Sequence, residues 1–277
     1  MSGVYVLGSN GQLGLCLKAL SPNWIFLTRH DVDLSQPENI KEYFSELINS
    51  KKPDHNGNIP SKIDYIVNLA AYTQVDKAES EPELAMKINA EASKELAAVC
   101  DNYFYISTDY VFSGNKKTPY TEEDECEPLS VYGKSKLLGE QWAQKSNPNT
   151  IVIRTSWLYS DYGQNFANKI IELSKTKSEL KIINDQIGSP TYAPDLAKVI
   201  LQMVSKRKHV PPGVYHYSNG SSCSWYEFAK EIFKSKNITT KLIPIPSSEY
   251  PQAAARPKYS VLDTTKILKL PGNLFKT

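Results

Sequence analysis

Short apolar runs alternate along the N-terminal half of the chain with longer segments in which apolar residues recur every three or four positions. The short runs are typical of strands buried on both faces of a sheet: residues 4–7, 24–27, 63–69, 103–106 and 151–153. The longer segments predict helices between those strands: residues 12–20, 37–48, 83–100 and 131–145. The alternation predicts an α/β fold in which helices cover both faces of a parallel sheet.

Beyond Arg154 the pattern becomes irregular. Turn-rich stretches such as NDQIGSPTYAP and VPPGVYHYSNGSSCS separate short predicted strands at residues 181–183 and 242–245. We expect this C-terminal half to build a smaller, substrate-facing lobe. A polar segment at residues 49–62, rich in turn formers, is expected to be a surface excursion before the third strand.

Composition changes this picture mainly by what it excludes. The 277 residues suffice for one large domain or for two that share an interface. Lysine and arginine number 32 against 30 acidic residues, without a block of one sign, so no nucleic-acid or membrane partner is expected. No apolar stretch approaches the roughly 20 residues that span a bilayer. Four cysteines without a CxxC pair suggest neither zinc nor disulfides, which favours a reducing cytoplasm.

The stretch VYVLGSNGQLG places three glycines directly after the first strand and at the start of the first helix. Gly8 allows a tight exit from the strand, Gly11 lets the backbone approach a pyrophosphate, and Gly14 lets helix and strand pack closely. Free N–H groups at the helix N-terminus would complete the anion site. The spacing is GxxGxxG instead of the common GxGxxG, and a glycine-rich turn without a ligand is the alternative. Interpreted as a dinucleotide loop, the stretch assigns cofactor contacts to Gly8, Asn10, Gly11, Gln12, Leu13 and Gly14.

The stretch FLTRHDVDLS, at the end of the second strand, bears on the choice of cofactor. An acidic residue there would hold the adenosine ribose of NADH, whereas a basic one would favour the 2′-phosphate of NADPH. Arg29 occupies this position, so NADPH is expected, with NADH as the alternative cofactor and a solvated surface arginine as the alternative interpretation. Asp33 and Leu34 are expected near the adenine edge.

A second group of polar residues follows the fourth strand, where STD at residues 107–109 precedes a tyrosine and a lysine four positions apart. Tyr132 and Lys136 fall on one face of the predicted helix. A lysine ammonium and an oxidised nicotinamide would lower the phenol pKa from about 10, so that Tyr132 exchanges a proton near neutral pH. Thr108 could hydrogen-bond a substrate carbonyl and the phenol, and Lys136 a nicotinamide ribose. YxxxK alone is common on amphipathic helices, but the glycine loop and STD favour an active site.

With these motifs in this order, the sequence resembles the extended short-chain dehydrogenase/reductase superfamily, and within it the dTDP-4-dehydrorhamnose reductases. The match covers nearly the whole chain. Its more specific blocks are NLAAYTQVDKAE, STDYVFSG with TPYTEED, YGKSKLLGE, RTSWLY, DQIGSPTYAPDLA and RPKYSVLD. The resemblance implies a Rossmann-like doubly wound parallel sheet with a smaller C-terminal α/β substrate-binding lobe. The dinucleotide-binding domain is expected at residues 1–157 and about 191–217, and the lobe at about 158–190 and 218–277.

The resemblance also implies a reaction and its site residues. Hydride would pass from NADPH to C4 of dTDP-4-dehydro-L-rhamnose, and Tyr132 would protonate the resulting oxygen to give dTDP-L-rhamnose. The implied catalytic residues are Thr108, Tyr132 and Lys136, the last two also contacting the cofactor. The strand end that lines the cofactor is matched by Ala70, Ala71 and Tyr72. The implied substrate contacts are Thr108, Asp109, Tyr110, Trp157, Asn165, Gln186 and Arg256.

Two of the implied substrate contacts also have a physical argument. The Trp157 indole could cover the sugar. The forked donors of Arg256 suit a phosphate, whereas a salt bridge to a nearby acid is the alternative. The chain departs from some bacterial relatives at Cys16, where they carry an acidic residue that binds magnesium at a dimer interface. We therefore expect Cys16 to be a small buried helix residue, no metal site, and a monomer or homodimer.

Three other functions share parts of this pattern. A sugar-nucleotide 4,6-dehydratase commonly has an Asp-Glu pair after the hydroxyl, whereas here Asp109 is followed by Tyr110. An epimerase shares the catalytic triad, but the blocks DQIGSPT and RTSWLY favour the reductase. The regulatory subunit of methionine adenosyltransferase belongs to the same branch and acts as a binding protein. The intact triad favours an enzyme over this third alternative.

Overall fold

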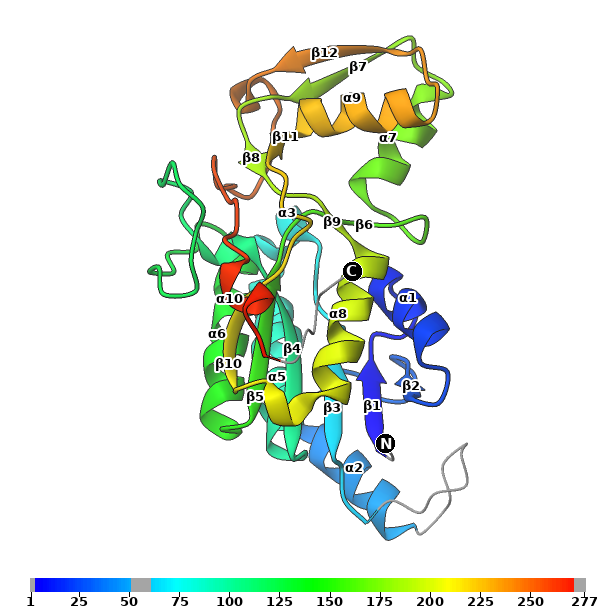
Figure 1. Cartoon of the computed structure of the whole chain (residues 1–277), viewed down its shortest axis with the longest axis vertical. Helices are drawn as coiled ribbons and strands as arrows, with labels where there is room; N and C mark the ends of the chain where they lie inside the picture. The colour runs from blue at the N-terminus through cyan, green and yellow to red at the C-terminus, as the bar shows by residue number, and fades with distance from the viewer. Residues whose placement is uncertain (1–2, 51–60, 272–277) are drawn as a thin grey trace.

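Six parallel strands form the central sheet of the computed structural model, which describes residues 3–50 and 61–271 (Figure 1). The strands are β1 (Val4–Leu7), β2 (Ile25–Leu27), β3 (Tyr65–Asn68), β4 (Asn102–Thr108), β5 (Thr150–Thr155) and β10 (Gly213–His216). Their order across the sheet is β10-β5-β4-β3-β1-β2. Because β2 and β3 lie on opposite sides of β1, the sheet is doubly wound, as predicted.

Helices cover both faces of this sheet, and alternate residues of each strand serve the two layers. Val4 and Val6 face α1 (Gln12–Leu20) and α8 (Ala193–Ser205) in one buried cluster. Tyr5 and Leu7 belong to the cluster on the other face. That second face is covered by α2 (Ile40–Asn49), α5 (Ala92–Ala98) and α6 (Val131–Ser146). Burial on both faces explains why the strands appear in the sequence as continuous apolar runs.

Strands β4 and β5 extend past the ends predicted from their apolar residues. Thr108 pairs with Thr155 and Ser107 with Arg154 at the carboxyl ends of these strands. Polar residues stay in the ladder here because the backbone hydrogen bonds do not depend on the side chain. The extension matters for function, since it places the predicted Thr108 hydroxyl on rigid sheet.

The helix predicted at residues 83–100 is interrupted by a wider turn. The structure has α4 (Pro82–Met86), a π-helical turn (Lys87–Glu91) and then α5. Within the π turn, the Asn89 carbonyl accepts a hydrogen bond of 2.8 Å from the Tyr105 hydroxyl, and its side chain bonds the backbone of Tyr72. Apolar periodicity cannot reveal such a turn, because it is made by contacts with another segment. The helix predicted from Pro37 similarly begins with a 3₁₀ turn (Pro37–Asn39) before α2.

A smaller lobe stands above the carboxyl ends of the strands (Figure 1). Its parallel pair β7 (Glu179–Ile183) and β12 (Lys241–Ile245) contains both short strands predicted for this half. The pair packs with α7 (Phe166–Ser174) and α9 (Trp225–Ser235) in one apolar cluster. Shorter elements complete the chain: α3 (Val75–Ala78), β6 (Leu158–Tyr159), β8 (Ile187–Gly188), β9 (Thr191–Tyr192), β11 (Cys223–Ser224) and α10 (Thr265–Leu268). The exact division of the chain between domain and lobe stays a prediction.

Two further features concern membranes and metals. Within residues 3–50 and 61–271, no helix has both the length and the apolar character needed to cross a bilayer. In the same ranges, no three histidine, cysteine, aspartate or glutamate side chains gather as a metal site would require. Cys16 is buried in α1, as predicted. Most of the surface excursion predicted at residues 49–62 lies outside the described residues.

Candidate active site

The glycine loop between β1 and α1 is pressed against neighbouring backbone. Gly8 has a φ of +80°, and a Cβ on it would lie 2.6 Å from the amide nitrogen of Ala70. A Cβ on Gly14 would lie 2.4 Å from the Gly8 carbonyl oxygen. Larger residues at either position would force the loop away from β3 and α1. The roles predicted for Gly8 and Gly14 are therefore the ones that the packing requires.

Two adjoining cavities run along the carboxyl ends of the strands. One, of about 250 Å³, is lined by Arg29, Asp33 and Leu34. The other, of about 710 Å³ and here called the catalytic cavity, is lined by Thr108, Asp109, Tyr132, Lys136, Trp157 and Asn165, and also by Gln12, Leu13 and Gly14. Both cavities share the wall residues Gly8, Asn10, Gly11, Ala70 and Ala71. They are thus two halves of one groove across the glycine loop, where doubly wound sheets bind their ligands.

Tyr72 differs from its neighbours in this groove. Its ring packs in a separate apolar cluster with Ala78 and Ala85, and its hydroxyl donates a 2.6 Å hydrogen bond to Glu81. The backbone of Tyr72 is held by Asn89. Tyr72 is thus held by Asn89 and Glu81 next to Ala71, which lines the groove, and its predicted cofactor contact stays a prediction.

Arg29 lies at the open end of the groove and has an acidic partner. Its Nε lies 3.3 Å from Oδ1 of Asp33, four residues further on, and its side chain is 75% exposed. Asp31 is engaged elsewhere, since it accepts hydrogen bonds of 2.7 Å from the amide and hydroxyl of Thr28. A 2′-phosphate at Arg29 would have to compete with the Asp33 carboxylate for the guanidinium.

The predicted triad converges in the catalytic cavity, where burial dominates the electrostatics of the protein's own residues. Burial raises the pKa of Tyr132 to about 12, although a hydrogen bond with Thr108 works against this rise. The Lys136 ammonium instead donates a 2.6 Å hydrogen bond to the Ile106 carbonyl and lies 4.0 Å from the ring centroid of Tyr105. Burial lowers the pKa of Lys136 to about 7, against the opposing charge of Glu140. The protein's own residues therefore keep the phenol protonated, because desolvation outweighs the hydrogen bond with Thr108.

Asp109 is a buried carboxyl beside the triad. Its Oδ1 accepts a 3.1 Å hydrogen bond from the Thr108 hydroxyl, and the Ser260 side chain also hydrogen-bonds the carboxyl. Burial raises the Asp109 pKa to about 7. Because it lines the catalytic cavity, Asp109 can offer a substrate hydroxyl either a donor or an acceptor.

A buried ion pair lies beneath the triad, and the sequence analysis did not identify it. Arg154 on β5 donates from Nε and Nη2 to Glu140 on α6, with a shortest distance of 2.6 Å. Glu140 also accepts from Ser107, next to Thr108. Its position four residues after Lys136 was the available signal, since it places both side chains on one helix face. The pair ties the catalytic helix to the strand ends that carry the hydroxyls.

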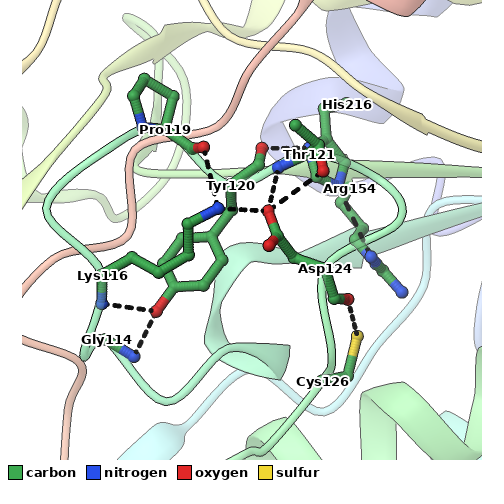
Figure 2. A network of polar contacts seen from close by, with 9 residues as sticks. All are labelled: Gly114, Lys116, Pro119, Tyr120, Thr121, Asp124, Cys126, Arg154 and His216. Carbon is green, nitrogen blue, oxygen red and sulfur yellow. Dashed lines mark hydrogen bonds and ion pairs between the residues drawn. The ribbon is translucent and has the colours of Figure 1, made fainter.

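The loop between β4 and α6 is closed by polar contacts (Figure 2). The Tyr120 hydroxyl accepts hydrogen bonds from the backbone amides of Gly114 and Lys116, and Asp124 accepts from Thr121 and Lys116. The Tyr120 carbonyl lies 3.0 Å from Nδ1 of His216 on β10. These contacts hold in place the long loop that connects β4 to the start of α6.

Trp157 and Asn165 reach the catalytic cavity from the segment that leads into the lobe. The Trp157 indole is stacked on Trp225 with ring centroids 3.5 Å apart, so one of its faces is already covered. Asn165 caps α7 by accepting from the amide of Asn168, and its Nδ2 donates to the Ser160 carbonyl at 2.8 Å. Trp225 starts α9, far from Trp157 along the chain, so no local residue pattern predicted this contact.

The other predicted substrate residues line a separate cavity of about 610 Å³ in the lobe, here called the lobe cavity. Tyr110, Gln186 and Arg256 face it, together with Lys169 and Lys181. Arg256 donates to both carboxylate oxygens of Asp76, at 2.9 and 2.6 Å. The salt bridge that the sequence left as an alternative is thus present. Tyr110 connects the two cavities, since its ring packs edge-on against Tyr132 with centroids 5.9 Å apart.

The fold and these cavities define a class: a Rossmann-like α/β protein with a dinucleotide loop, a Tyr-Lys pair and a second lobe over the strand ends. The family model of the RmlD substrate binding domain matches residues 1–275. The chain belongs to this family, the dTDP-4-dehydrorhamnose reductases, and the predicted resemblance is confirmed.

Individual relatives agree with this assignment. The dTDP-4-dehydrorhamnose reductase of Sinorhizobium fredii is 39% identical over 282 residues, covering 96% of this chain and 90% of that protein. The spore coat polysaccharide biosynthesis protein SpsK of Bacillus subtilis is 38% identical over 270 residues, covering 95% and 89%. The crystal structure of dTDP-4-dehydrorhamnose reductase from Bacillus anthracis, in complex with NADP, matches with a TM-score of 0.85 at 35% identity, covering 95% and 91%.

Proposed function

We propose that this protein is an NADPH-dependent dTDP-4-dehydrorhamnose reductase, which reduces the C4 carbonyl of dTDP-4-dehydro-L-rhamnose to give dTDP-L-rhamnose. The observation that carries the proposal is that Thr108, Tyr132 and Lys136 line the same cavity as the glycine loop. The NADP complex of the Bacillus anthracis relative supports the choice of cofactor. NADPH, when bound, supplies the hydride.

The protein's residues would supply the proton and the alignment. Tyr132 is protonated at neutral pH, because burial raises its pKa to about 12. Its phenol can therefore donate a proton to the oxygen that gains negative charge as C4 is reduced. Thr108 lies beside the phenol and can hydrogen-bond the same oxygen. The Ile106 carbonyl holds the Lys136 side chain by a hydrogen bond. From this position Lys136 can reach the nicotinamide ribose.

The two cavities suggest how a nucleotide sugar would lie. Its sugar would occupy the catalytic cavity near Tyr132, and its nucleotide diphosphate would extend past Tyr110 into the lobe cavity. Lys169, Lys181 and Arg256 supply positive charge there. Phosphate oxygens could bind Arg256 from the side opposite Asp76, which already orients its guanidinium.

The decisive experiment follows NADPH oxidation with dTDP-4-dehydro-L-rhamnose and with a panel of other nucleotide-linked 4-keto sugars, using the wild type and Tyr132→Phe. We expect the rhamnose precursor to be preferred, and the variant to lose turnover about 10²- to 10⁴-fold while it still binds NADPH. Preference for another 4-keto sugar would reassign the substrate. Undiminished turnover in Tyr132→Phe would remove this residue as the proton donor.

A further inference from the structure

Trp157 and Trp225 form a stacked pair at the boundary between the two cavities. Their ring centroids are 3.5 Å apart, with the ring planes within 8° of parallel. Trp157 lines the catalytic cavity, whereas Trp225 lines the lobe cavity. A nucleotide sugar that extends from one cavity to the other must therefore pass these indoles.

The backbone of Trp157 is strained. Its φ is +48°. In the described chain, one other non-glycine residue, Asn237, has a positive φ. A bulky aromatic residue rarely adopts this left-handed conformation, since its Cβ crowds the following carbonyl. Such strain persists where the surroundings hold it, and it is concentrated at functional sites.

The segment of β8 and β9 holds Trp157 from one direction. A Cβ on Gly188 would lie 2.5 Å from Cε2 of the indole, so the ring packs directly on the glycine backbone. The Trp157 carbonyl accepts a 3.3 Å hydrogen bond from the Thr191 amide. The neighbouring Ser156 hydroxyl donates to the Ser189 carbonyl at 2.6 Å. These contacts fix the backbone of Trp157, but they do not cover the ring face that is turned toward α9.

Trp225 covers that face from a rigid position. It is the first residue of α9 and lies within a capping box in which Ser224 and Glu227 satisfy each other's backbone amides. Phe166 of α7 packs against Trp225 with ring centroids 4.6 Å apart. The helix start and the lobe core together prevent Trp225 from moving away from Trp157.

We propose that Trp225 is a positioning residue, which holds the Trp157 indole so that the sugar of a nucleotide-linked substrate aligns with Tyr132. The inference rests on the proposed function. It predicts a specific kinetic effect, because misplacement of the reacting carbon by about an ångström can cost about 100-fold in rate. Trp225→Leu should lower kcat/KM for the nucleotide sugar about 10- to 100-fold. The KM for NADPH should stay unchanged, since Trp225 lines neither of the two cavities that form the cofactor groove.

The stack itself is tested in the free protein, without substrate. Two stacked indoles produce an exciton couplet in far-ultraviolet circular dichroism when their transition dipoles are rotated relative to each other within the ring planes. Trp225→Leu should abolish this couplet, whereas the control Trp142→Phe, on α6 and away from both cavities, should keep it. Trp225→Phe should lose the couplet but recover most of kcat/KM, because a phenyl ring still covers the indole. Recovery by phenylalanine distinguishes positioning from a general loss of folding.

Each outcome decides the inference. Loss of the couplet together with a sugar-specific loss of kcat/KM supports it. A Trp225→Leu variant with unchanged sugar kinetics overturns it. If the wild type reduces no 4-keto sugar nucleotide, the proposed function fails. The inference is then decided by calorimetric binding of a dTDP-sugar: weaker binding in Trp225→Leu than in Trp142→Phe supports it, and equal binding overturns it.

Discussion

The catalytic cavity and the lobe cavity are built in different ways. The first is lined by one glycine loop, neighbouring strand ends and one face of α6. The second gathers residues from Asp76 to Arg256, most of them on the lobe. Each region contains an arginine–carboxylate pair, and these pairs show the contrast directly. In Glu140–Arg154 both side chains are at most 5% exposed, whereas in Asp76–Arg256 the aspartate is 49% exposed. The ion pair near the strand ends is thus buried in the sheet domain, whereas the pair at the lobe cavity is half open to water.

The largest expected effect concerns the buried pair. Glu140→Gln leaves the Arg154 guanidinium buried without a carboxylate, so the free energy of unfolding should fall by about 3–5 kcal/mol. Urea denaturation monitored by circular dichroism measures this change. A loss below about 1 kcal/mol would mean that the two pairs do not differ as their burial indicates.

The next effect tests the burial of Lys136 through pH. Its pKa is about 7 in the folded protein against 10.5 for an ordinary lysine. Between these values the unfolded chain binds a proton that the folded protein does not, so stability rises with pH in this window. Relative to Lys136→Met, the wild type should gain about 2 kcal/mol between pH 7 and pH 9 in the absence of cofactor. A difference in unfolding free energy that does not change with pH would contradict the lowered pKa.

A smaller effect is expected at the open end of the cofactor groove. Arg29→Ala should lower kcat/KM with NADPH about tenfold, the value of one charged hydrogen bond, and leave NADH unaffected. The matched variant Asp33→Asn releases Arg29 from its carboxylate partner and should increase the preference for NADPH. Steady-state kinetics with both cofactors measure these ratios. An unchanged preference in Arg29→Ala would exclude the residue from phosphate recognition.

The smallest effect completes the comparison of the two pairs. Asp76→Asn removes the partner of Arg256 where water reaches the carboxylate, so the free energy of unfolding should change by less than about 1 kcal/mol. The measurement is the same urea denaturation as for Glu140→Gln. Equal losses in the two variants would show that solvent exposure does not separate these pairs.

The sequence was most informative where a function depends on spacing along the chain. The glycine loop and the Tyr132–Lys136 pair were found because a strand exit and a helical turn have fixed geometry. Apolar runs located the strands but ended β4 and β5 too early, because Thr108 and Thr155 are polar. Burial of the phenol raises the pKa of Tyr132 in the protein without cofactor, which is a property of the packed structure. The fall expected beside an oxidised nicotinamide stays a prediction.

Local residue patterns by themselves determined the class of fold, the cofactor loop and the side chains that share one face of the catalytic helix. These depend on the period of a helix or a strand, which nearby residues set. The tertiary structure alone decided that Glu140 pairs with Arg154, that Asp76 takes Arg256, and that Trp225 covers Trp157. In each contact, the number of residues between the two partners does not predict that they will meet. The contacts form because the fold brings these charges and large rings close together. Where a group is buried, it loses water as a partner and needs one from the protein.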